Sequence, residues 1–264
     1  IPMKSLNIMR NDREKAIKNN YLENSTWVKG LINNNSGDIK IKGLSGQHWL
    51  SNTRNSLKIK LKEKNNIYKN IPNNMSSFSL HKLSARQYPY EFIFQDLLKE
   101  LGFPYTKHNI IKVKFNGKNW GLMNMQENFG SQWLEKNKLK DSLIVNFGND
   151  DYMMKYENKV DHPLSPNKYW ISNPRIFQTL TSKNTKKLTP LEIKRFNYIQ
   201  SMIKKDNYQE ILFNLKPLIE IEEILKIWGN LHPIRLTNSK FYFNPYTLKL
   251  DPLIIDQGNF YEYD

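Results

Sequence analysis

A turn signal near the middle of the chain constrains the fold more than any other feature. Residues 109–128, NIIKVKFNGKNWGLMNMQEN, place Asn116-Gly117 between two runs in which apolar and polar residues alternate. Asn-Gly favours a two-residue hairpin turn, because both turn positions need the positive φ that these residues tolerate best. The pattern therefore predicts two long antiparallel strands.

Four more strands and one helix are predicted before this hairpin. Period-two alternation or short apolar runs place the strands at residues 27–32, 38–44, 56–61 and 78–83. Residues 88–103 begin near Pro89, carry apolar residues at helical spacing and end at Gly102-Phe103-Pro104. This punctuation predicts an amphipathic helix.

The character of the chain changes after Asn128. Helical patterns are found at residues 131–140, 189–205 and 218–234, and residues 146–190 are polar and predicted to be loop-rich. A second hairpin, with strands at 239–243 and 248–255, follows. We therefore predict an α+β protein of two lobes that share a cleft, a β-rich lobe at residues 1–128 and a mostly helical lobe at 129–264.

The positive charge of the chain suggests phosphate-bearing partners more than a dedicated nucleic-acid face. The net charge is +15, but only seven of the 40 basic residues are Arg, and the lysines are scattered. Arg is the side chain best suited to bidentate phosphate and base contacts. A solvated basic surface is therefore favoured, and nucleic-acid binding is kept as the weaker alternative.

Cysteine usage and hydropathy exclude several protein classes. The 264 residues contain no cysteine, which excludes disulfides and thiolate metal sites. No apolar run approaches the roughly 18 residues that span a bilayer, and no signal-peptide pattern is found. We expect a soluble protein, with the cytoplasm favoured, and a native chain that continues beyond both ends.

Two neighbouring features of the first lobe are suited to anion binding. The loop at residues 43–46 would offer backbone N–H groups to a phosphate through Gly43, Ser45 and Gly46; the alternative is an ordinary β-turn, with His48 and Trp49 as packing residues. The next strand places Arg54, Ser56, Lys58 and Lys60 on one face.

That basic face is either solvated or directed into the cleft. A cation that faces the cleft needs an anion or an acidic partner. Glu91, in the first turn of the predicted helix, is suited to be that partner, although it would equally be favoured there by the helix dipole.

The C-terminal hairpin suggests a metal site. Asn238 precedes its first strand and Asp256 follows its second, so strand pairing would bring them together. An amide oxygen and a carboxylate are hard ligands suited to Mg²⁺, which substrate phosphates also hold. The alternative is that Asn238 caps the backbone and that Asp256 forms an Asx turn.

Taken in order along the chain, four segments resemble the CotH family of spore-coat, kinase-like proteins. They are IKGLSGQHWLSNTRNSLKIKL, DLLKELGFP, HNIIKVKFNGKNWGLMNMQENFGSQWLEKN and NSKFYFNPYTLKLDPLIIDQG. The resemblance is distributed over about residues 37–260, with a divergent middle.

The resemblance implies an atypical protein-kinase-like fold that binds ATP and Mg²⁺ or Mn²⁺ between two lobes. It assigns metal binding to Asp256 and Asn238, pairing with the nucleotide-binding cation to Glu91, and a hinge position to Glu127. The backbone near Met125 would contact adenine, and the loop from Gly43 to Gly46 would cover the phosphates.

Three departures from the family pattern bear on activity. Arg54-Asn55-Ser56-Leu57 replaces the family's K-K-S-Y, so Arg54 or Lys58 would take the place of the nucleotide-binding Lys. Pro233 stands where the resemblance places the catalytic Asp, which leaves His232 either as a substitute base or as a packing residue. Ile254 replaces an acid.

The resemblance and its departures lead to two functional hypotheses. The first is a transferase that uses ATP and moves a phosphoryl or nucleotidyl group to a protein or glycan acceptor. The alternative is a pseudokinase that serves as a binding or assembly module, since a missing general base costs on the order of 10²–10⁴ in rate.

Overall fold

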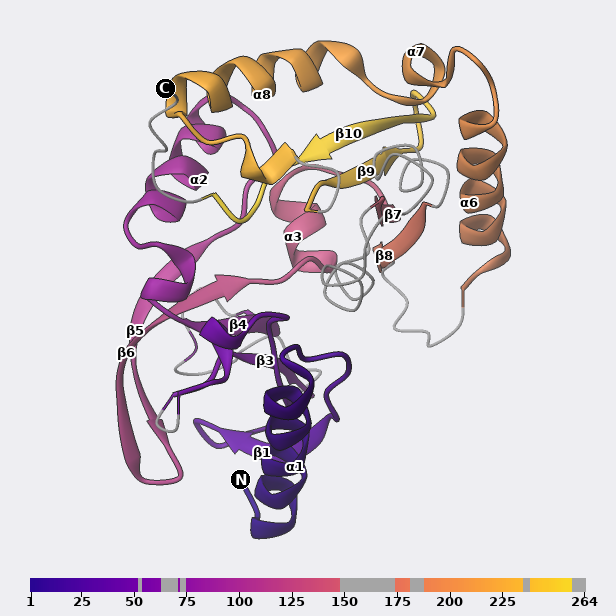
Figure 1. The fold of residues 1–264 in the computed structure, drawn as a ribbon. Coiled ribbons are helices and arrows are strands. Elements are labelled where there is room, and N and C mark those ends of the chain that lie inside the picture. Colours follow the sequence, from indigo (N-terminus) through magenta and orange to yellow (C-terminus); the bar gives the residue numbers. More distant parts are fainter. Residues whose placement is uncertain are drawn as a thin grey trace. The chain divides into compact units, whose positions relative to one another are not determined.

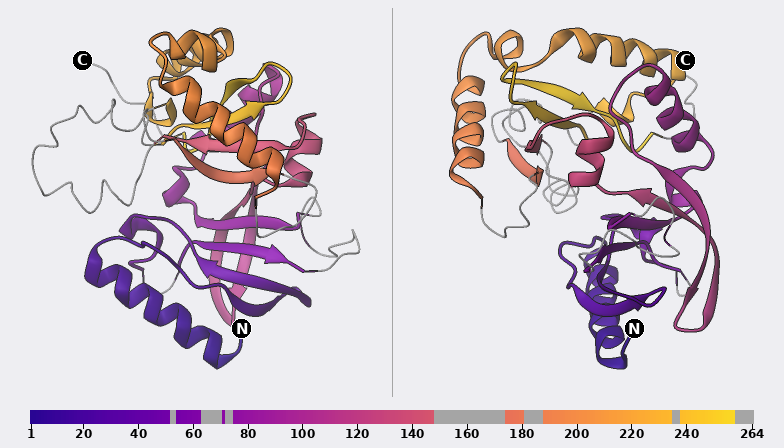
Figure 2. Two further views of the ribbon diagram at one scale, coloured as in Figure 1. Left: turned by 90° about the vertical axis from the view of Figure 1, so that its right-hand side faces the viewer. Right: turned by 180° about the vertical axis from the view of Figure 1, so that it is seen from behind.

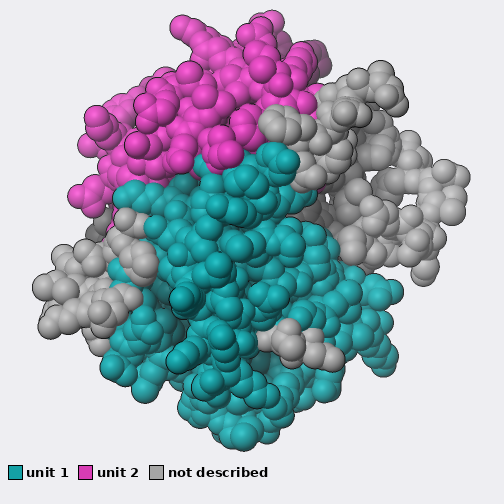
Figure 3. All heavy atoms as spheres, turned by 90° about the vertical axis from the view of Figure 1, so that its left-hand side faces the viewer, with its two compact units in different colours: residues 1–92, 106–128 teal, residues 93–105, 129–264 magenta. Residues whose placement is uncertain are grey.

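The computed structural model describes residues 1–51, 54–62, 71, 75–147, 174–180, 188–234 and 238–257. The chain divides into two compact units (Figure 3). Unit 1 comprises residues 1–92 and 106–128, and unit 2 comprises residues 93–105 and 129–264. Both units contain a β-sheet and helices, which confirms the predicted α+β class.

Unit 1 is built on a six-stranded antiparallel sheet with the order β1-β2-β3-β4-β6-β5 (Figure 1). Its strands are β1 (Val28–Ile32), β2 (Asn35–Ile41), β3 (Leu57–Leu61), β4 (Ser77–Lys82), β5 (His108–Phe115) and β6 (Lys118–Glu127). Every predicted strand of this half is present. The turn between β5 and β6 has positive φ at both Asn116 and Gly117, as the hairpin signal requires.

The two faces of this sheet differ because paired residues project to the same side. Ile41, Leu57, Leu80 and Met125 form one row across β2, β3, β4 and β6, and all four are buried in a hydrophobic core. The adjacent row on the other face is polar and consists of Lys40, Lys58, Ser79, Gln126 and His108.

Helix α1 (Met3–Asn19) packs against β1 and β2 and has no counterpart among the predicted elements (Figure 2). Its buried residues are Ser5, Met9, Asp12 and Ala16, and the residue before it makes no side-chain capping bond. A buried stripe that mixes polar and small residues produces little hydrophobic periodicity, which explains why the sequence does not reveal this helix.

Helix α2 (Tyr90–Glu100) begins in unit 1 and continues in unit 2. It follows the short 3₁₀ turn Ser84–Arg86, and the chain leaves it at Gly102, which has a φ of 80°. A left-handed glycine after the last turn is a common helix stop. The predicted helix at residues 88–103 is therefore confirmed, with ends two to three residues further in.

Unit 2 contains a four-stranded antiparallel sheet with the order β10-β9-β7-β8. Its strands are β7 (Ser142–Asn146), β8 (Arg175–Leu180), β9 (Lys240–Asn244) and β10 (Lys249–Leu253), and its helices are α3 (Ser131–Lys136), α6 (Pro190–Ile203), α7 (Tyr208–Leu212) and α8 (Leu215–Trp228). The hairpin β9–β10 was predicted. Strands β7 and β8 were not, so this half is less helical than expected.

Local sequence explains where α6 begins and where α8 ends. Thr189 and Glu192 form a capping box at the start of α6, with Pro190 at its first position. Gly229 ends α8 with a φ of 75°. Among the described residues, no helix is long and apolar enough to cross a membrane.

Candidate functional site

Lysines gather on the polar face of the unit 1 sheet. Lys40 on β2 lies opposite Lys58 on β3, and Lys60 follows on the same face. The Nζ atoms of Lys40 and Lys60 lie 5.2 and 5.3 Å from the ring centre of Trp27. This arrangement concentrates positive charge on two neighbouring strands.

Lys58 is the least compensated of these cations. Burial lowers the pKa of its ammonium group from 10.5 to about 8, with Lys60 and Lys40 adding to the shift. It forms no hydrogen bond or ion pair with any other residue that the structure describes. A buried ammonium group without a counter-charge is costly, so this position is suited to an anion.

The loop at residues 43–46 follows β2, the strand that carries Lys40. The indole Nε1–H of Trp49 donates to the carbonyl oxygens of Gly43 (3.1 Å) and Leu44 (3.2 Å). Within the described part of the chain, the N–H groups of residues 43–46 have no hydrogen-bond partner. Unpaired consecutive N–H groups form the type of backbone surface that binds anions.

Two further cations of unit 1 are already engaged. Lys42 donates from Nζ to Ser79 Oγ at 2.8 Å, and Ser79 donates to Asn128 Oδ1 at 2.7 Å. The Arg54 guanidinium group donates to the carbonyl oxygen of Trp120 at 3.3 Å. Of the two cations that the sequence offered for phosphate binding, Lys58 is therefore the better placed.

Glu91 is fully buried and lies beside Arg86, whereas Arg54 or Lys58 was the expected partner. Its charge raises the pKa of the buried Arg86 guanidinium, partly offsetting the lowering by burial, and its Oε1 lies 3.7 Å from His108 Nε2. Neither Arg54 nor Lys58 forms an ion pair with a described residue. The 3₁₀ turn that brings Arg86 close has no clear signal in the sequence.

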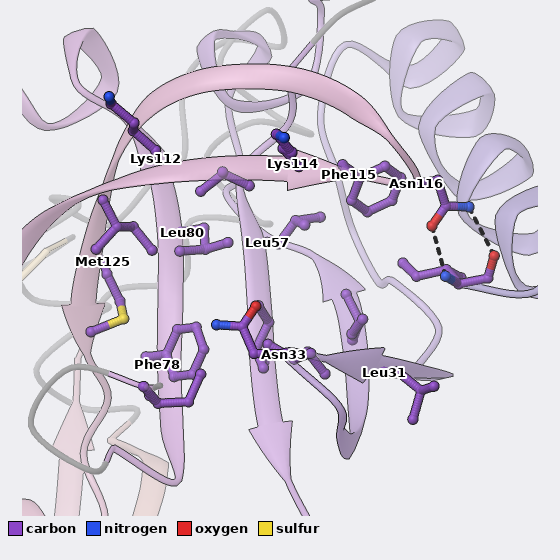
Figure 4. A pocket seen from close by; sticks show the side chains of 17 residues that line it. Leu31, Asn33, Leu57, Phe78, Leu80, Lys112, Lys114, Phe115, Asn116 and Met125 are labelled. Atoms are coloured by element: carbon purple, nitrogen blue, oxygen red, sulfur yellow. Dashed lines mark hydrogen bonds between the residues drawn. The ribbon is translucent and has the colours of Figure 1, made fainter. Parts of the chain in front are cut away.

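The predicted adenine-contacting segment lies in β6. The Met125 side chain is buried and lines a pocket of about 280 Å³ in unit 1, together with Leu57, Phe78 and Leu80 (Figure 4). Glu127 donates from its backbone N–H to the Lys107 carbonyl at 2.9 Å, and its carboxylate accepts from the Lys107 N–H at 3.1 Å. These bonds engage Glu127 within the sheet.

In unit 2, Asn238 and Asp256 flank the β9–β10 hairpin as predicted. Pairing ends at Lys240 and Leu253, so Asn238 lies two residues before this end and Asp256 three residues after it. The buried amide nitrogen of Asn238 has no hydrogen-bond partner among the described residues. The oxygen and nitrogen of an amide are told apart only by their hydrogen bonds. If the Asn238 amide is rotated by 180°, its oxygen takes the unpaired position, where it fits a cation ligand.

Contacts on both sides position Asp256. Gln95 on α2 donates from Nε2 to the Ile254 carbonyl at 2.9 Å, and Gln257 donates from Nε2 to the Asn230 carbonyl at 3.2 Å. Asp256 itself has a φ of 72°. A residue other than glycine in this region is uncommon and persists only where its surroundings hold it.

His232 and Pro233 form part of the short 3₁₀ turn His232–Ile234 in unit 2. His232 is exposed and Pro233 is buried, so the packing residue here is the proline. Among the described residues, no group of three or more His, Asp or Glu side chains is arranged to hold a metal by itself. A cation at Asn238 and Asp256 would need further ligands, as Mg²⁺ commonly takes from phosphates.

Comparison with known proteins identifies one protein-family model. The model described as CotH kinase protein matches residues 39–226. This range includes Lys58, the loop at 43–46 and Glu91, whereas Asn238 and Asp256 lie outside it. Comparison with curated protein sequences gives no match.

Proposed function

The chain belongs to the CotH kinase family, and from this membership we propose that it binds ATP with Mg²⁺ or Mn²⁺ and transfers a phosphoryl or nucleotidyl group. The acceptor is a protein or a glycan. Units 1 and 2 correspond in this proposal to the two lobes of a protein-kinase-like fold. Phosphoryl transfer depends chiefly on positioning and charge neutralisation, and the candidate groups are suited to both.

The observation that carries the proposal is the uncompensated charge of Lys58. Lys58 is half-buried beside Lys40 and Lys60, and its ammonium group has no partner among the described residues. Triphosphate oxygens would supply the missing negative charge. The N–H groups of residues 43–46 follow the neighbouring strand and have no partner among the residues that the structure describes, so they would add hydrogen bonds to the same anion.

Unit 2 contributes the metal ligands in this proposal. The Asp256 carboxylate and the Asn238 amide would hold the divalent cation, which when bound neutralises phosphate charge. The anchored neighbours of Asp256 support this role, because Ile254 and Gln257 are both held by hydrogen bonds. Preorganised ligands lose little entropy when the cation binds.

Titration calorimetry with Mg-ATP tests nucleotide binding, and transfer of radiolabel from ATP tests turnover. We expect wild type to bind Mg-ATP and Asp256→Asn to lose metal-dependent label transfer. Asp206→Asn, which removes an exposed carboxylate elsewhere in unit 2, is the matched control and should behave like wild type. A folded wild-type protein with no affinity for Mg-ATP would exclude the proposal.

Pro233 favours a second candidate, a pseudokinase that binds nucleotide without turnover. The residue is buried in a 3₁₀ turn and has no proton-accepting group. This candidate predicts Mg-ATP binding without label transfer from either α- or γ-labelled ATP. Transfer to any protein or glycan acceptor that is abolished by Asp256→Asn would rule it out.

A further inference from the structure

Ser56 connects the chain on the two sides of the loop at residues 43–46. Its carbonyl oxygen accepts from the Lys42 N–H at 2.9 Å, and its own N–H donates to the His48 carbonyl at 2.7 Å. Lys42 immediately precedes the loop, and His48 lies two residues after it. Ser56, the residue before β3, therefore closes the loop through backbone bonds alone.

The Ser56 hydroxyl group adds a side-chain contact to this closure. Ser56 Oγ lies 2.9 Å from His48 Nδ1 and 3.3 Å from His81 Nδ1. Ser56 and His81 are fully buried, and His48 is 7% exposed. A hydroxyl group donates one hydrogen bond and accepts up to two, so at least one of the two histidines must donate to Ser56.

Arg86 determines which histidine donates to Ser56 and which accepts from it. Its NH2 group lies 3.5 Å from His81 Nε2, and a guanidinium group can only donate. His81 therefore accepts at Nε2 and carries its proton on Nδ1, which donates to Ser56. The described residues offer the Ser56 hydroxyl proton no acceptor other than His48 Nδ1. The hydroxyl therefore donates to His48, and the bonds run in one direction from Arg86 to His48.

Both histidines are held in the neutral form that this chain of bonds requires. Burial lowers the pKa of His48 to about 3, with Arg86, Lys42 and Lys82 adding to the shift. Burial, followed by the charges of Arg86 and Lys42, also lowers the pKa of His81 well below its usual value.

The His48 ring also determines where the loop begins. A Cβ atom on Gly43 would clash with this ring, and Gly43 has a φ of 98°. Glycine is required here both for its conformation and for its lack of a side chain. A shift of the His48 ring would therefore move the first residue of the loop.

We propose that His48, Ser56 and His81 are positioning residues that hold the loop at residues 43–46 in its anion-binding conformation. This inference rests on the proposed function, because the bound anion is taken to be the triphosphate of ATP. The three side chains act through the loop and do not touch the nucleotide. Arg86 orients them by fixing the tautomer of His81.

Nitrogen chemical shifts of the imidazole rings test the direction of the bonds. In wild type we expect the proton on Nδ1 of His81 and on Nε2 of His48. The opposite pair of tautomers would overturn the relay from Arg86, since Ser56 would then have to donate to His81. A structural role that depends only on packing does not predict either tautomer.

Ser56→Ala tests the effect on the loop, because it removes the hydroxyl group and keeps both backbone bonds. We expect the Lys42 amide to exchange with deuterium about tenfold faster and the affinity for Mg-ATP to fall about tenfold. Ser36→Ala, an exposed change on β2, is the control and should alter neither. Unchanged affinity in Ser56→Ala, with or without faster exchange, would overturn the positioning role.

A pair of His48 variants separates hydrogen bonding from ring size. An asparagine amide places an acceptor near the position of Nδ1, whereas a glutamine amide places it near Nε2. We expect His48→Asn to keep the affinity within about threefold and His48→Gln to resemble Ser56→Ala; equal losses in both would count against the hydroxyl contact. If wild type binds no Mg-ATP, the proposed function fails, while tautomers and amide exchange still report on the closure.

Discussion

The two faces of the unit 1 sheet are made by alternate residues of the same strands and serve different purposes. On one face, Leu57 and Met125 belong to a continuous hydrophobic core. On the other, Lys58 and Ser79 belong to a row of polar residues that are half-buried or buried. Apolar burial stabilises the fold, whereas an uncompensated buried charge destabilises it. Neighbouring residues in one strand are therefore expected to respond in opposite ways to substitution.

Leu57→Ala is expected to have the largest effect on stability. The side chain is 2% exposed and packed in the core, and removing it should lower the free energy of unfolding by about 2–5 kcal/mol. Denaturant unfolding followed by circular dichroism measures this change. A loss below about 1 kcal/mol would show that the apolar face is less tightly packed than its burial indicates.

Acidification is expected to destabilise the protein through the polar face. The pKa of His48 is about 3 in the folded chain and near 6.5 when unfolded, so the unfolded state binds more protons between these values. From pH 7 to pH 5 this one residue should lower the free energy of unfolding by about 2 kcal/mol. Comparing the pH dependence of unfolding in wild type and His48→Asn isolates the contribution, and identical slopes would contradict it.

Lys58→Met should weaken nucleotide binding without weakening the fold. We expect the affinity for Mg-ATP to fall about tenfold or more, and the free energy of unfolding to stay equal or to rise, because a buried charge is removed. In wild type the affinity should also decline as the pH rises through about 8, where the Lys58 ammonium group loses its proton. Titration calorimetry at pH 7 and 9 should show this decline in wild type and a weaker one in the variant.

Lys60→Met is the matched control and should have the smallest effect. Lys60 lies on the same face as Lys58 but is exposed, so solvent already compensates its charge. We expect the affinity to change less than threefold. An effect as large as that of Lys58→Met would show that the face acts through its total charge and not through one buried ammonium group.

Much of this arrangement follows from sequence periodicity. The alternation in residues 56–61 placed Lys58 and Leu57 on opposite faces, and Asn116-Gly117 located the β5–β6 turn. Helix α1 escaped prediction because its buried stripe includes Ser5 and Asp12. Strand β7 escaped because it is buried along most of its length and shows no alternation.

The candidate site was less accessible to sequence reasoning where it depends on strand register. His48 was interpreted as a packing residue, and nothing in the sequence shows that it meets the Ser56 hydroxyl group. The position of Arg86 beside Glu91 depends on a single 3₁₀ turn. The metal-binding role of Asp256 and Asn238 stays a prediction, which rests on the way a hairpin brings the residues that flank it to the same end.

The two ammonium groups over Trp27 should make its fluorescence sensitive to ligands on the polar face. Indole emission responds to nearby charge, and Lys40 and Lys60 lie just over 5 Å from this ring. An anion that draws either lysine away would change the local field at Trp27, which is 38% exposed. The difference in fluorescence between wild type and Trp27→Phe would then serve as a label-free titration of ligands on this face.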